Sequence, residues 1–253
     1  MTKRTVMITG ASRGLGLALV RAFAPEAGLL VLAAREAGHI GEARRAAADC
    51  PVHAAGGDLS SREGISRLLS EVGPERLGAV DVLVNNAGWG QPGALADSAE
   101  DDVVRTYFTD LIAPALLCRA AAGGMIRRRW GRIVNISSIT AVQPSEGLAA
   151  YASAKAGLNA LTKSLSAETA RHGVTVNAIM PGLMLTDMGR DAVAKMGAAR
   201  TGSGEAEVLE RIKRSVPLRK LTEVSEVAAL VRWLAGDEAA FLTGQVIGAA
   251  GGL

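Results

Sequence analysis

Tyr151 and Lys155 stand four residues apart in a stretch whose apolar pattern predicts a helix over Ala150–Arg171. Side chains with this spacing leave a helix on the same face. A tyrosine hydroxyl ordinarily has a pKa near ~10. A neighbouring ammonium favours the phenolate and brings this pKa closer to working pH. The pair can therefore donate a proton to a reacting group. Taken alone, however, this spacing is more typical of a surface tyrosine beside a solvated lysine.

A glycine-rich run near the start of the chain offers a second kind of chemistry. Residues 9–16, TGASRGLG, connect an apolar strand candidate to an amphipathic helix candidate. Glycines allow a tight turn and a close backbone approach, while a helix N-terminus presents unpaired N–H groups to an anion. In this position the run predicts a dinucleotide site. An ordinary strand-to-helix turn is the alternative for such a run taken alone.

Strand-length apolar runs alternate with longer amphipathic stretches, which is typical of βαβ units around a parallel sheet. The expected strands are Val6–Thr9, Leu29–Ala33, Val52–Ala55, Val80–Val84, Ile133–Ile136, Thr175–Ile179 and Gln245–Ile247. The expected long helices are Leu15–Ala24, Ala99–Ala122, Ala150–Arg171 and Glu223–Leu234. The chain is thus predicted to be α/β, a single-domain, Rossmann-like, doubly wound fold over residues 1–253 with a seven-stranded parallel sheet. The small polar run Gly197–Gly204 is expected to be a mobile loop tip.

Composition argues against several other classes of protein. With 49% hydrophobic and 21% charged residues the chain reads as a packed globular protein. The net charge is only +3, and the densest basic run, Arg127–Arg129, is expected to end a helix, so no nucleic-acid partner is expected. Cys50 and Cys118 are the only cysteines, and neither a disulfide nor a metal site is expected. Since we find no leader and no segment of membrane-spanning character, the expected protein is soluble and cytoplasmic.

Further motifs occur in a fixed order along the chain. NNAG occupies residues 85–88, PGxxxTDM residues 181–188, and the closing pattern comprises Thr243-Gly244-Gln245 and Gly251-Gly252. Ser138 ends the segment that follows the fifth expected strand, upstream of Tyr151. Together with TGxxxGxG, these motifs resemble the short-chain dehydrogenase/reductase family over essentially the whole chain. The pattern is most similar to that of 3-oxoacyl-acyl-carrier-protein reductases.

The resemblance implies hydride transfer from NADPH to a ketone. In the family, Tyr151 would be the proton donor, Lys155 would also hold the nicotinamide ribose, and Ser138 would hydrogen-bond the carbonyl as charge develops on its oxygen. Ser137 is the rival serine, for which a structural hydrogen bond is expected. The residues then expected to bind the cofactor are Gly10, Ser12, Arg13, Gly14, Leu15, Gly16, Arg35, Asp58, Leu59, Asn86, Ala87, Gly88, Tyr151, Lys155, Pro181, Gly182 and Thr186.

The end of the second expected strand bears on the choice of cofactor. NAD-specific relatives place an acidic residue there, whereas this chain has Arg35. Arg35 and Arg13 can form a cationic fork around a 2′-phosphate, which favours NADPH/NADP. NAD remains the alternative, because a shift of one residue would bring Glu36 toward a ribose hydroxyl. Asp58 is expected beside adenine, with capping of the following helix as its other possible role.

Asp110 marks a departure from the family pattern. Relatives often carry a catalytic asparagine at this point, where the residue supports a helix kink and a water chain to the active-site lysine. If the backbone carbonyl of this residue holds the water, aspartate can replace asparagine. If the side-chain charge matters, Asp110 could pair with Lys155, weaken the influence of Lys155 on Tyr151, or alter proton resupply. Asp110 is therefore carried as either a catalytic or a structural residue.

The substrate side is less clearly marked. The segment 188–217 is longer than in typical acyl-carrier-protein reductases and is expected to cover the substrate, which would be a small carbonyl compound, β-ketoacyl or polyketide-like, free or carrier-bound. Candidate pocket residues, each also consistent with ordinary packing, are Trp89, Val142, Leu148, Leu183, Met184 and Met196. A homotetramer formed through the helices Ala99–Ala122 and Ala150–Arg171 is expected from relatives. Alternative functions are a cofactor-binding protein with impaired reductase activity, or an epimerase, dehydratase or cyclase.

Overall fold

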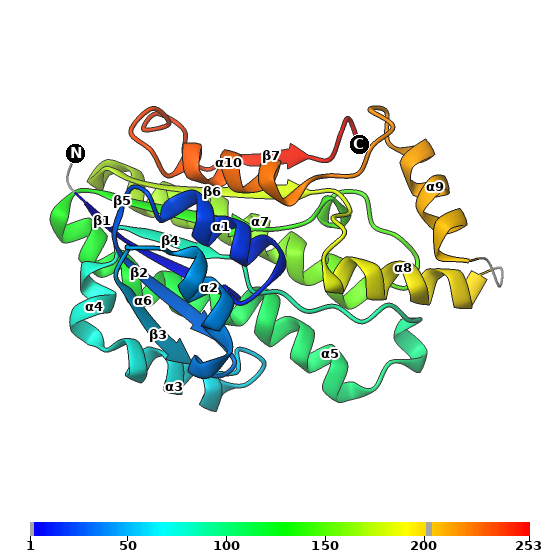
Figure 1. The fold of residues 1–253 in the computed structure, drawn as a ribbon, viewed down its shortest axis with the longest axis horizontal. Coiled ribbons are helices and arrows are strands. Elements are labelled where there is room, and N and C mark those ends of the chain that lie inside the picture. The colour runs from blue at the N-terminus through cyan, green and yellow to red at the C-terminus, as the bar shows by residue number, and fades with distance from the viewer. Residues whose placement is uncertain (1–2, 201–203) are drawn as a thin grey trace.

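One sheet of seven parallel strands organises the protein, as the sequence predicts (Figure 1). The computed structural model describes the backbone of residues 3–200 and 204–253, and the side chains of these residues except 196–200. Within this part of the chain the strand order is β3-β2-β1-β4-β5-β6-β7. The strands are β1 (Arg4–Thr9), β2 (Ala27–Ala34), β3 (Val52–Gly56), β4 (Val82–Asn85), β5 (Gly131–Ile136), β6 (Val174–Pro181) and β7 (Val246–Ala249).

Helices cover both faces of the sheet, because side chains alternate between the faces along each strand. In β1, Val6 and Ile8 belong to one apolar core, whereas Met7 belongs to the other. The first core is closed by α1 (Gly14–Phe23), α2 (Gly41–Ala46) and α10 (Val224–Leu234). The second is closed by α3 (Arg62–Val72), α4 (Pro74–Ala79), α6 (Ala113–Arg128) and α7 (Ala149–Thr169). Short 3₁₀ turns lie at Ala37–Ile40, Leu95–Asp97, Ile139–Ala141 and Ala170–His172.

The helix expected at Ala99–Ala122 proves longer and is interrupted by a wider turn. It comprises α5 (Glu100–Tyr107), a π-helical turn at Phe108–Ile112 and α6, which ends at Arg128. Arg129 follows in a left-handed conformation, so the basic triplet ends a helix as expected. A π turn inserts one residue into the helical repeat and commonly marks a functional position. Asp110 lies inside this turn.

The same helix corrects one expectation about membranes. Among the described residues, the continuous helix Glu100–Arg128 is long and apolar enough to cross a bilayer by length and composition. The expectation that no segment has this character is therefore wrong. More than half of the apolar window, 56%, is buried inside the protein. Core helices of this length meet the same criteria, because packing against a sheet also requires an apolar surface.

The region after β6 differs from the expected loop. The helix α8 (Asp187–Arg200) takes up the first part of Gly197–Gly204, and α9 (Glu205–Ser215) begins directly after Gly204. Residues 201–203 lie outside the described residues, so the predicted mobility of this tip stays a prediction. In Figure 1, α8 and α9, which contain most of the segment expected to cover the substrate, project beyond the carboxyl ends of the strands.

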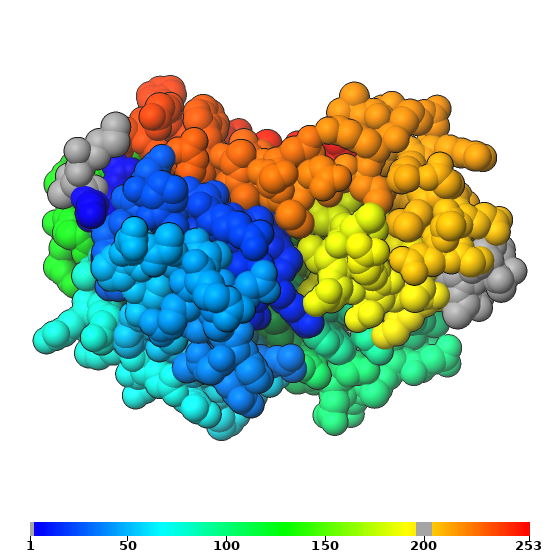
Figure 2. Space-filling model, in the orientation of Figure 1, coloured from blue at the N-terminus to red at the C-terminus, as the bar shows by residue number. Residues whose placement is uncertain are grey.

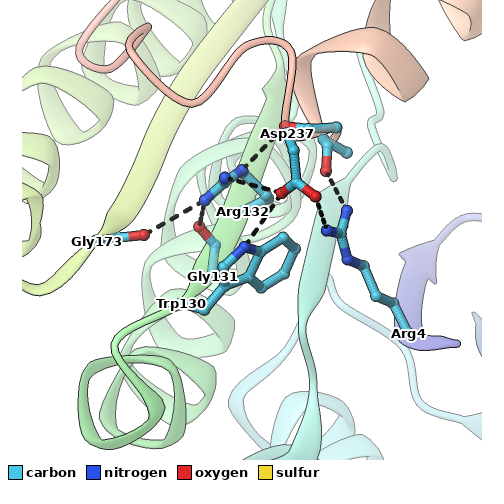
Figure 3. A network of polar contacts seen from close by, with 8 residues as sticks. Arg4, Trp130, Gly131, Arg132, Gly173 and Asp237 are labelled. Atoms are coloured by element: carbon cyan, nitrogen blue, oxygen red, sulfur yellow. Dashed lines mark hydrogen bonds and ion pairs between the residues drawn. The ribbon is translucent and has the colours of Figure 1, made fainter. Parts of the chain in front are cut away.

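At the opposite end of the sheet, an aromatic ring is flanked by two cations (Figure 3). The guanidinium groups of Arg4 and Arg132 lie 4.0 and 4.4 Å from the ring centre of Trp130. Asp237 accepts hydrogen bonds from Arg4 at 2.6 Å and from the Trp130 indole at 3.3 Å. Arg132 also donates to the carbonyls of Gly131 and Gly173. This cluster ties the starts of β1 and β5 to the chain after α10.

Replacing Asp237 by asparagine should weaken this cluster while keeping its shape. The hydrogen bond from Arg4 holds the pKa of Asp237 below its usual value. The carboxylate therefore stabilises the fold at pH values above the ordinary aspartate pKa, and this contribution fades as the pH falls through the lowered pKa. Because Asp237 is largely exposed, we expect Asp237→Asn to cost about 1 kcal/mol at neutral pH. Urea unfolding at several pH values measures the difference, and an equal loss at neutral and strongly acidic pH would contradict this account.

Candidate active site

A cleft of about 370 Å³ opens at the carboxyl ends of the strands, where the sheet order reverses between β1 and β4. Chains leaving neighbouring strands at such a point diverge to opposite faces and leave a crevice between them. In Figure 2 a hollow lies where the blue N-terminal surface, the yellow surface of α8 and the green surface behind them meet. The position of the cleft follows from topology alone.

The glycine-rich turn forms one wall of the cleft. Gly10 has φ +64°, and a Cβ there would lie 2.9 Å from the Ala87 Cα. A Cβ at Gly16 would lie 2.0 Å from the Gly10 carbonyl oxygen, so both positions require glycine. The Thr9 hydroxyl accepts hydrogen bonds from the amides of Asn86 and Ala87, both at 3.0 Å. This contact joins the turn to the NNAG segment and leaves the N-terminus of α1 facing the cleft.

Ser138, Tyr151 and Lys155 lie on the cleft wall across from this turn. Ser138 follows β5 and accepts hydrogen bonds from the amide of Thr140 at 3.2 Å and from its hydroxyl at 2.8 Å. Tyr151 and Lys155 share one face of α7, with the lysine Nζ 5.6 Å from the centre of the tyrosine ring. The hydroxyl of Ser137 donates instead to the Lys155 carbonyl, which is the structural bond expected for it.

Lys155 is buried and meets two oxygen acceptors. Its Nζ lies 2.8 Å from Oδ1 of Asp110 and donates to the Ile136 carbonyl at 2.8 Å. Asp110 is fully buried, and its Oδ2 accepts a hydrogen bond from the amide of Trp89 at 3.0 Å. One of the possibilities left open for Asp110, its pairing with Lys155, is therefore present in the structure. The π turn carries this carboxylate to the back of the cleft.

The loop after NNAG fits closely between these groups. A Cβ at Gly90 would lie 2.8 Å from the Tyr151 ring, and a Cβ at Gly88 would lie 3.0 Å from Oδ1 of Asp110. Sequence reasoning did not single out Gly90. Its only signal was its place beside a conspicuous tryptophan in the loop after β4. The close contact limits the rotation of the Tyr151 ring.

Electrostatics at this wall favour a charged lysine and a neutral tyrosine. Burial opposes the charge on Lys155, but the Asp110 carboxylate outweighs this and holds the pKa of Lys155 above its usual value. Burial also raises the pKa of Tyr151. The Lys155 ammonium and a hydrogen bond with Ser138 lower this pKa in part, whereas the negative charge of Asp110 raises it further. The tyrosine therefore keeps its proton at neutral pH.

Two further charged residues, Arg35 and Asp58, line another part of the cleft. Arg35 lines the cleft, whereas Glu36 pairs with His39 at 3.4 Å. Asp58 also lines the cleft and accepts hydrogen bonds from the amide and the hydroxyl of Ser60. Burial raises the pKa of Asp58, but these hydrogen bonds outweigh burial and hold the pKa below its usual value. The cap of α3 is Ser61, so the alternative role proposed for Asp58 is wrong.

Every residue predicted to bind the dinucleotide lines this cleft, and Asp110 lies behind it. Of the predicted pocket residues, Trp89 and Met184 line the cleft. Val142, Leu148 and Leu183 are not among its described lining residues, and the Met196 side chain lies outside the description. Lining residues that sequence reasoning did not assign to the site include Arg105, Thr109 and Asp187. Arg105, in α5, lies 4.8 Å from the centre of the Trp89 ring in the loop after β4, a contact that no local sequence pattern predicts.

The residues of the cleft can hold a phosphorylated dinucleotide. Glycines without Cβ atoms leave the backbone open beside a helix N-terminus, and Arg13 and Arg35 add positive charge. The same cleft is lined by a serine, a tyrosine and a charged lysine, namely Ser138, Tyr151 and Lys155. These are the groups that acid catalysis on a carbonyl requires.

Comparisons with known proteins agree with this geometry. The family model for short chain dehydrogenase matches residues 4–197. An acetoacetyl-CoA reductase of Shinella zoogloeoides is 36% identical, with 98% of each chain covered. A 3-oxoacyl-acyl-carrier-protein reductase of Pseudomonas aeruginosa is 31% identical, covering 99% of this chain and 97% of its own. A solved structure of actinorhodin polyketide ketoreductase with NADPH superposes with a TM-score of 0.87 at 33% identity, covering 98% and 96% of the two chains.

Each of these relatives extends over nearly the whole chain, and the family model spans both the glycine-rich turn and the Ser138, Tyr151 and Lys155 wall. On these grounds the protein belongs to the short-chain dehydrogenase/reductase family.

Proposed function

We propose that the protein is an NADPH-dependent reductase of a ketone, β-ketoacyl or polyketide-like, free or carrier-bound. The observation that carries the proposal is the placement of Ser138, Tyr151 and a charged Lys155 on one wall of a cleft whose other wall is a glycine-rich dinucleotide turn. Relatives with matching length include reductases of acetoacetyl-CoA and of 3-oxoacyl carrier proteins. Their shared chemistry is reduction of a β-keto group.

When bound, NADPH supplies the hydride that the carbonyl carbon receives. The Tyr151 hydroxyl gives its proton to the carbonyl oxygen, and the Ser138 hydroxyl hydrogen-bonds that oxygen as negative charge develops. The Lys155 ammonium then stabilises the phenolate left on Tyr151. The product is an alcohol, and the reverse oxidation uses the same groups in the opposite order.

Asp110 acts in this proposal as a positioning residue. Its carboxylate fixes the direction of the Lys155 side chain and keeps the ammonium charged in a buried place. The same negative charge makes it harder for Tyr151 to lose its proton. The expected result is an acid that stays protonated to higher pH than it would beside a neutral amide.

Removing the Tyr151 hydroxyl should impair turnover while leaving the cofactor site intact. We expect Tyr151→Phe to bind NADPH with affinity close to that of the wild type and to reduce an acetoacetyl thioester about 10²-fold more slowly, the usual loss for a positioned acid. Tyr107→Phe is the matched control, since its hydroxyl bonds Ser153 away from the cleft. Near-normal turnover in Tyr151→Phe would remove this hydroxyl from the mechanism.

Asp110→Asn should keep the shape of the site and remove its negative charge. The reductase should stay active, and the limb of the kcat/KM profile that reports loss of the Tyr151 proton should move to lower pH. Because the chain has two tyrosines, tyrosinate absorbance in wild type and Tyr107→Phe isolates the titration of Tyr151. That titration should shift in the same direction.

The competing possibility is that Asp110 disables reduction and leaves a protein that only binds the cofactor. In that case the wild type would be inactive across carbonyl substrates, and Asp110→Asn would restore turnover. An active wild type with an unshifted profile in the variant would contradict any electrostatic role of Asp110. An epimerase, dehydratase or cyclase on the same scaffold would form product without net oxidation of NADPH.

Preference for NADPH over NADH is assigned in this proposal to Arg35 and Arg13. The supporting observations are that both arginines line the cleft and that Glu36 is turned to His39. Loss of a charged hydrogen bond to phosphate should weaken NADPH binding by Arg35→Ala about tenfold, with little change for NADH. Titration calorimetry with both cofactors measures the ratio. An unchanged ratio would mean that Arg35 does not recognise the 2′-phosphate.

The remaining parts of the proposal concern assembly and the covering segment. We expect a cytoplasmic homotetramer that packs through the α5–α6 helix and α7, with residues 188–217 as a lid over the substrate. Small residues on these helices allow close approach of helix axes. Light scattering at micromolar concentration should give four times the mass of 26.0 kDa. A monomeric mass would contradict this assembly.

A further inference from the structure

An ion pair at the mouth of the cleft joins the glycine-rich turn to the start of α8. Nη1 of Arg13, in the glycine-rich turn, donates to Oδ2 of Asp187, the first residue of α8, at 2.9 Å. Both side chains line the cleft and are mostly exposed, at 67% and 63%. Thr186 packs against Gly14, where a Cβ would lie 3.0 Å from Thr186 Cγ2. In Figure 2 the blue N-terminal surface lies next to the yellow surface of α8.

Two other cations that line the cleft, Lys155 and Arg105, are held in different ways. Lys155 is occupied by Asp110 and the Ile136 carbonyl, and Arg105 lies over the Trp89 ring. Arg13, in contrast, sits at the N-terminal cap of α1 without a side-chain capping bond. An anion that enters beside this helix N-terminus would meet Arg13 and also the carboxylate that holds Arg13.

We propose that Asp187 is a specificity-determining residue that competes with the 2′-phosphate of the dinucleotide for Arg13. The inference rests on the proposed function in one respect, which is that Arg13 recognises the 2′-phosphate. Cofactors with and without that phosphate share a pyrophosphate, so repulsion between the pyrophosphate and Asp187 affects both alike. Only the phosphorylated cofactor must also draw Arg13 away from its partner. Asp187 therefore reduces the preference for NADPH over NADH that Arg13 and Arg35 create.

The size of the effect follows from the exposure of the pair. Ion pairs at a solvated surface contribute up to about 1 kcal/mol, which corresponds to about fivefold in a binding constant. Asp187→Asn should therefore raise the affinity for NADPH relative to that for NADH about threefold to fivefold. Salt screens exposed pairs, so the gain should shrink as ionic strength rises.

A double-mutant cycle tests whether the effect passes through Arg13. Dissociation constants for NADPH and NADH are measured by calorimetry for wild type, Asp187→Asn, Arg13→Ala and the double variant. We expect Arg13→Ala to weaken the binding of NADPH. In the Arg13→Ala background, Asp187→Asn should no longer raise the affinity for NADPH relative to that for NADH. Asp191→Asn, an exposed carboxylate one turn further along α8, is the matched control and should leave the cofactor ratio as in wild type.

Several outcomes would overturn the proposal. These are an unchanged NADPH to NADH ratio in Asp187→Asn, an equal gain for both cofactors, or a gain that persists without Arg13. Turnover of an acetoacetyl thioester by the same variants separates this failure from failure of the proposed function. If the variants still reduce the thioester but Asp187→Asn leaves the NADPH to NADH affinity ratio unchanged, only the role of Asp187 is rejected. If no variant and no wild-type protein reduces it, the proposed reductase function is rejected.

Discussion

The buried ion pair between Lys155 and Asp110 is the interaction on which the rest of the site depends. Removing two charges from water costs several kcal/mol per ion, so such a pair persists only when its hydrogen bonds are well satisfied. Here Nζ forms an ion pair with Oδ1 of Asp110 and donates a hydrogen bond to the Ile136 carbonyl, and Oδ2 of Asp110 accepts one from the Trp89 amide. One pair thus connects the π turn, α7, the end of β5 and the loop after β4. Its value is the fixed direction of a charged lysine rather than stability.

The strand order explains why these segments meet. All seven strands point the same way, so each segment that follows a strand emerges at the same edge of the sheet. The order reverses between β1 and β4, which opens the cleft between the glycine-rich turn and the NNAG segment. Helix α7 then presents Tyr151 and Lys155 toward the cleft from the far side of β5. The charged groups at the mouth belong to the turn after β1 and to the start of α8, which are brought together only by this topology.

Much of this arrangement could be predicted from the sequence, because it is written in local patterns. Buried parallel strands are continuously apolar. Spaced motifs such as TGxxxGxG and the Tyr151–Lys155 pair can be recognised from the sequence alone. The π turn at Phe108–Ile112 could not be read, because its residues suit an ordinary helix equally well. The partner of Arg13 could not be predicted either, because Asp187 approaches it from a distant part of the chain. The contact of Arg105 with Trp89 joins a helix to a loop and follows no sequence pattern. The predicted end of the helix Ala99–Ala122 was wrong, because α6 continues to Arg128, and α8 extends into the first part of the expected loop Gly197–Gly204.

The central claim, that this cleft transfers hydride to a ketone, is tested most directly by isotope transfer. The wild-type protein is incubated with an acetoacetyl thioester and NADPH carrying two deuterium atoms at the C4 position of the nicotinamide, and the product is examined by mass spectrometry. The account predicts a β-hydroxyacyl product with one deuterium on the carbon that bears the new hydroxyl, and one equivalent of oxidised cofactor. A product without deuterium, or cofactor that binds without any product across a panel of β-keto thioesters and polyketide-like ketones, would contradict it.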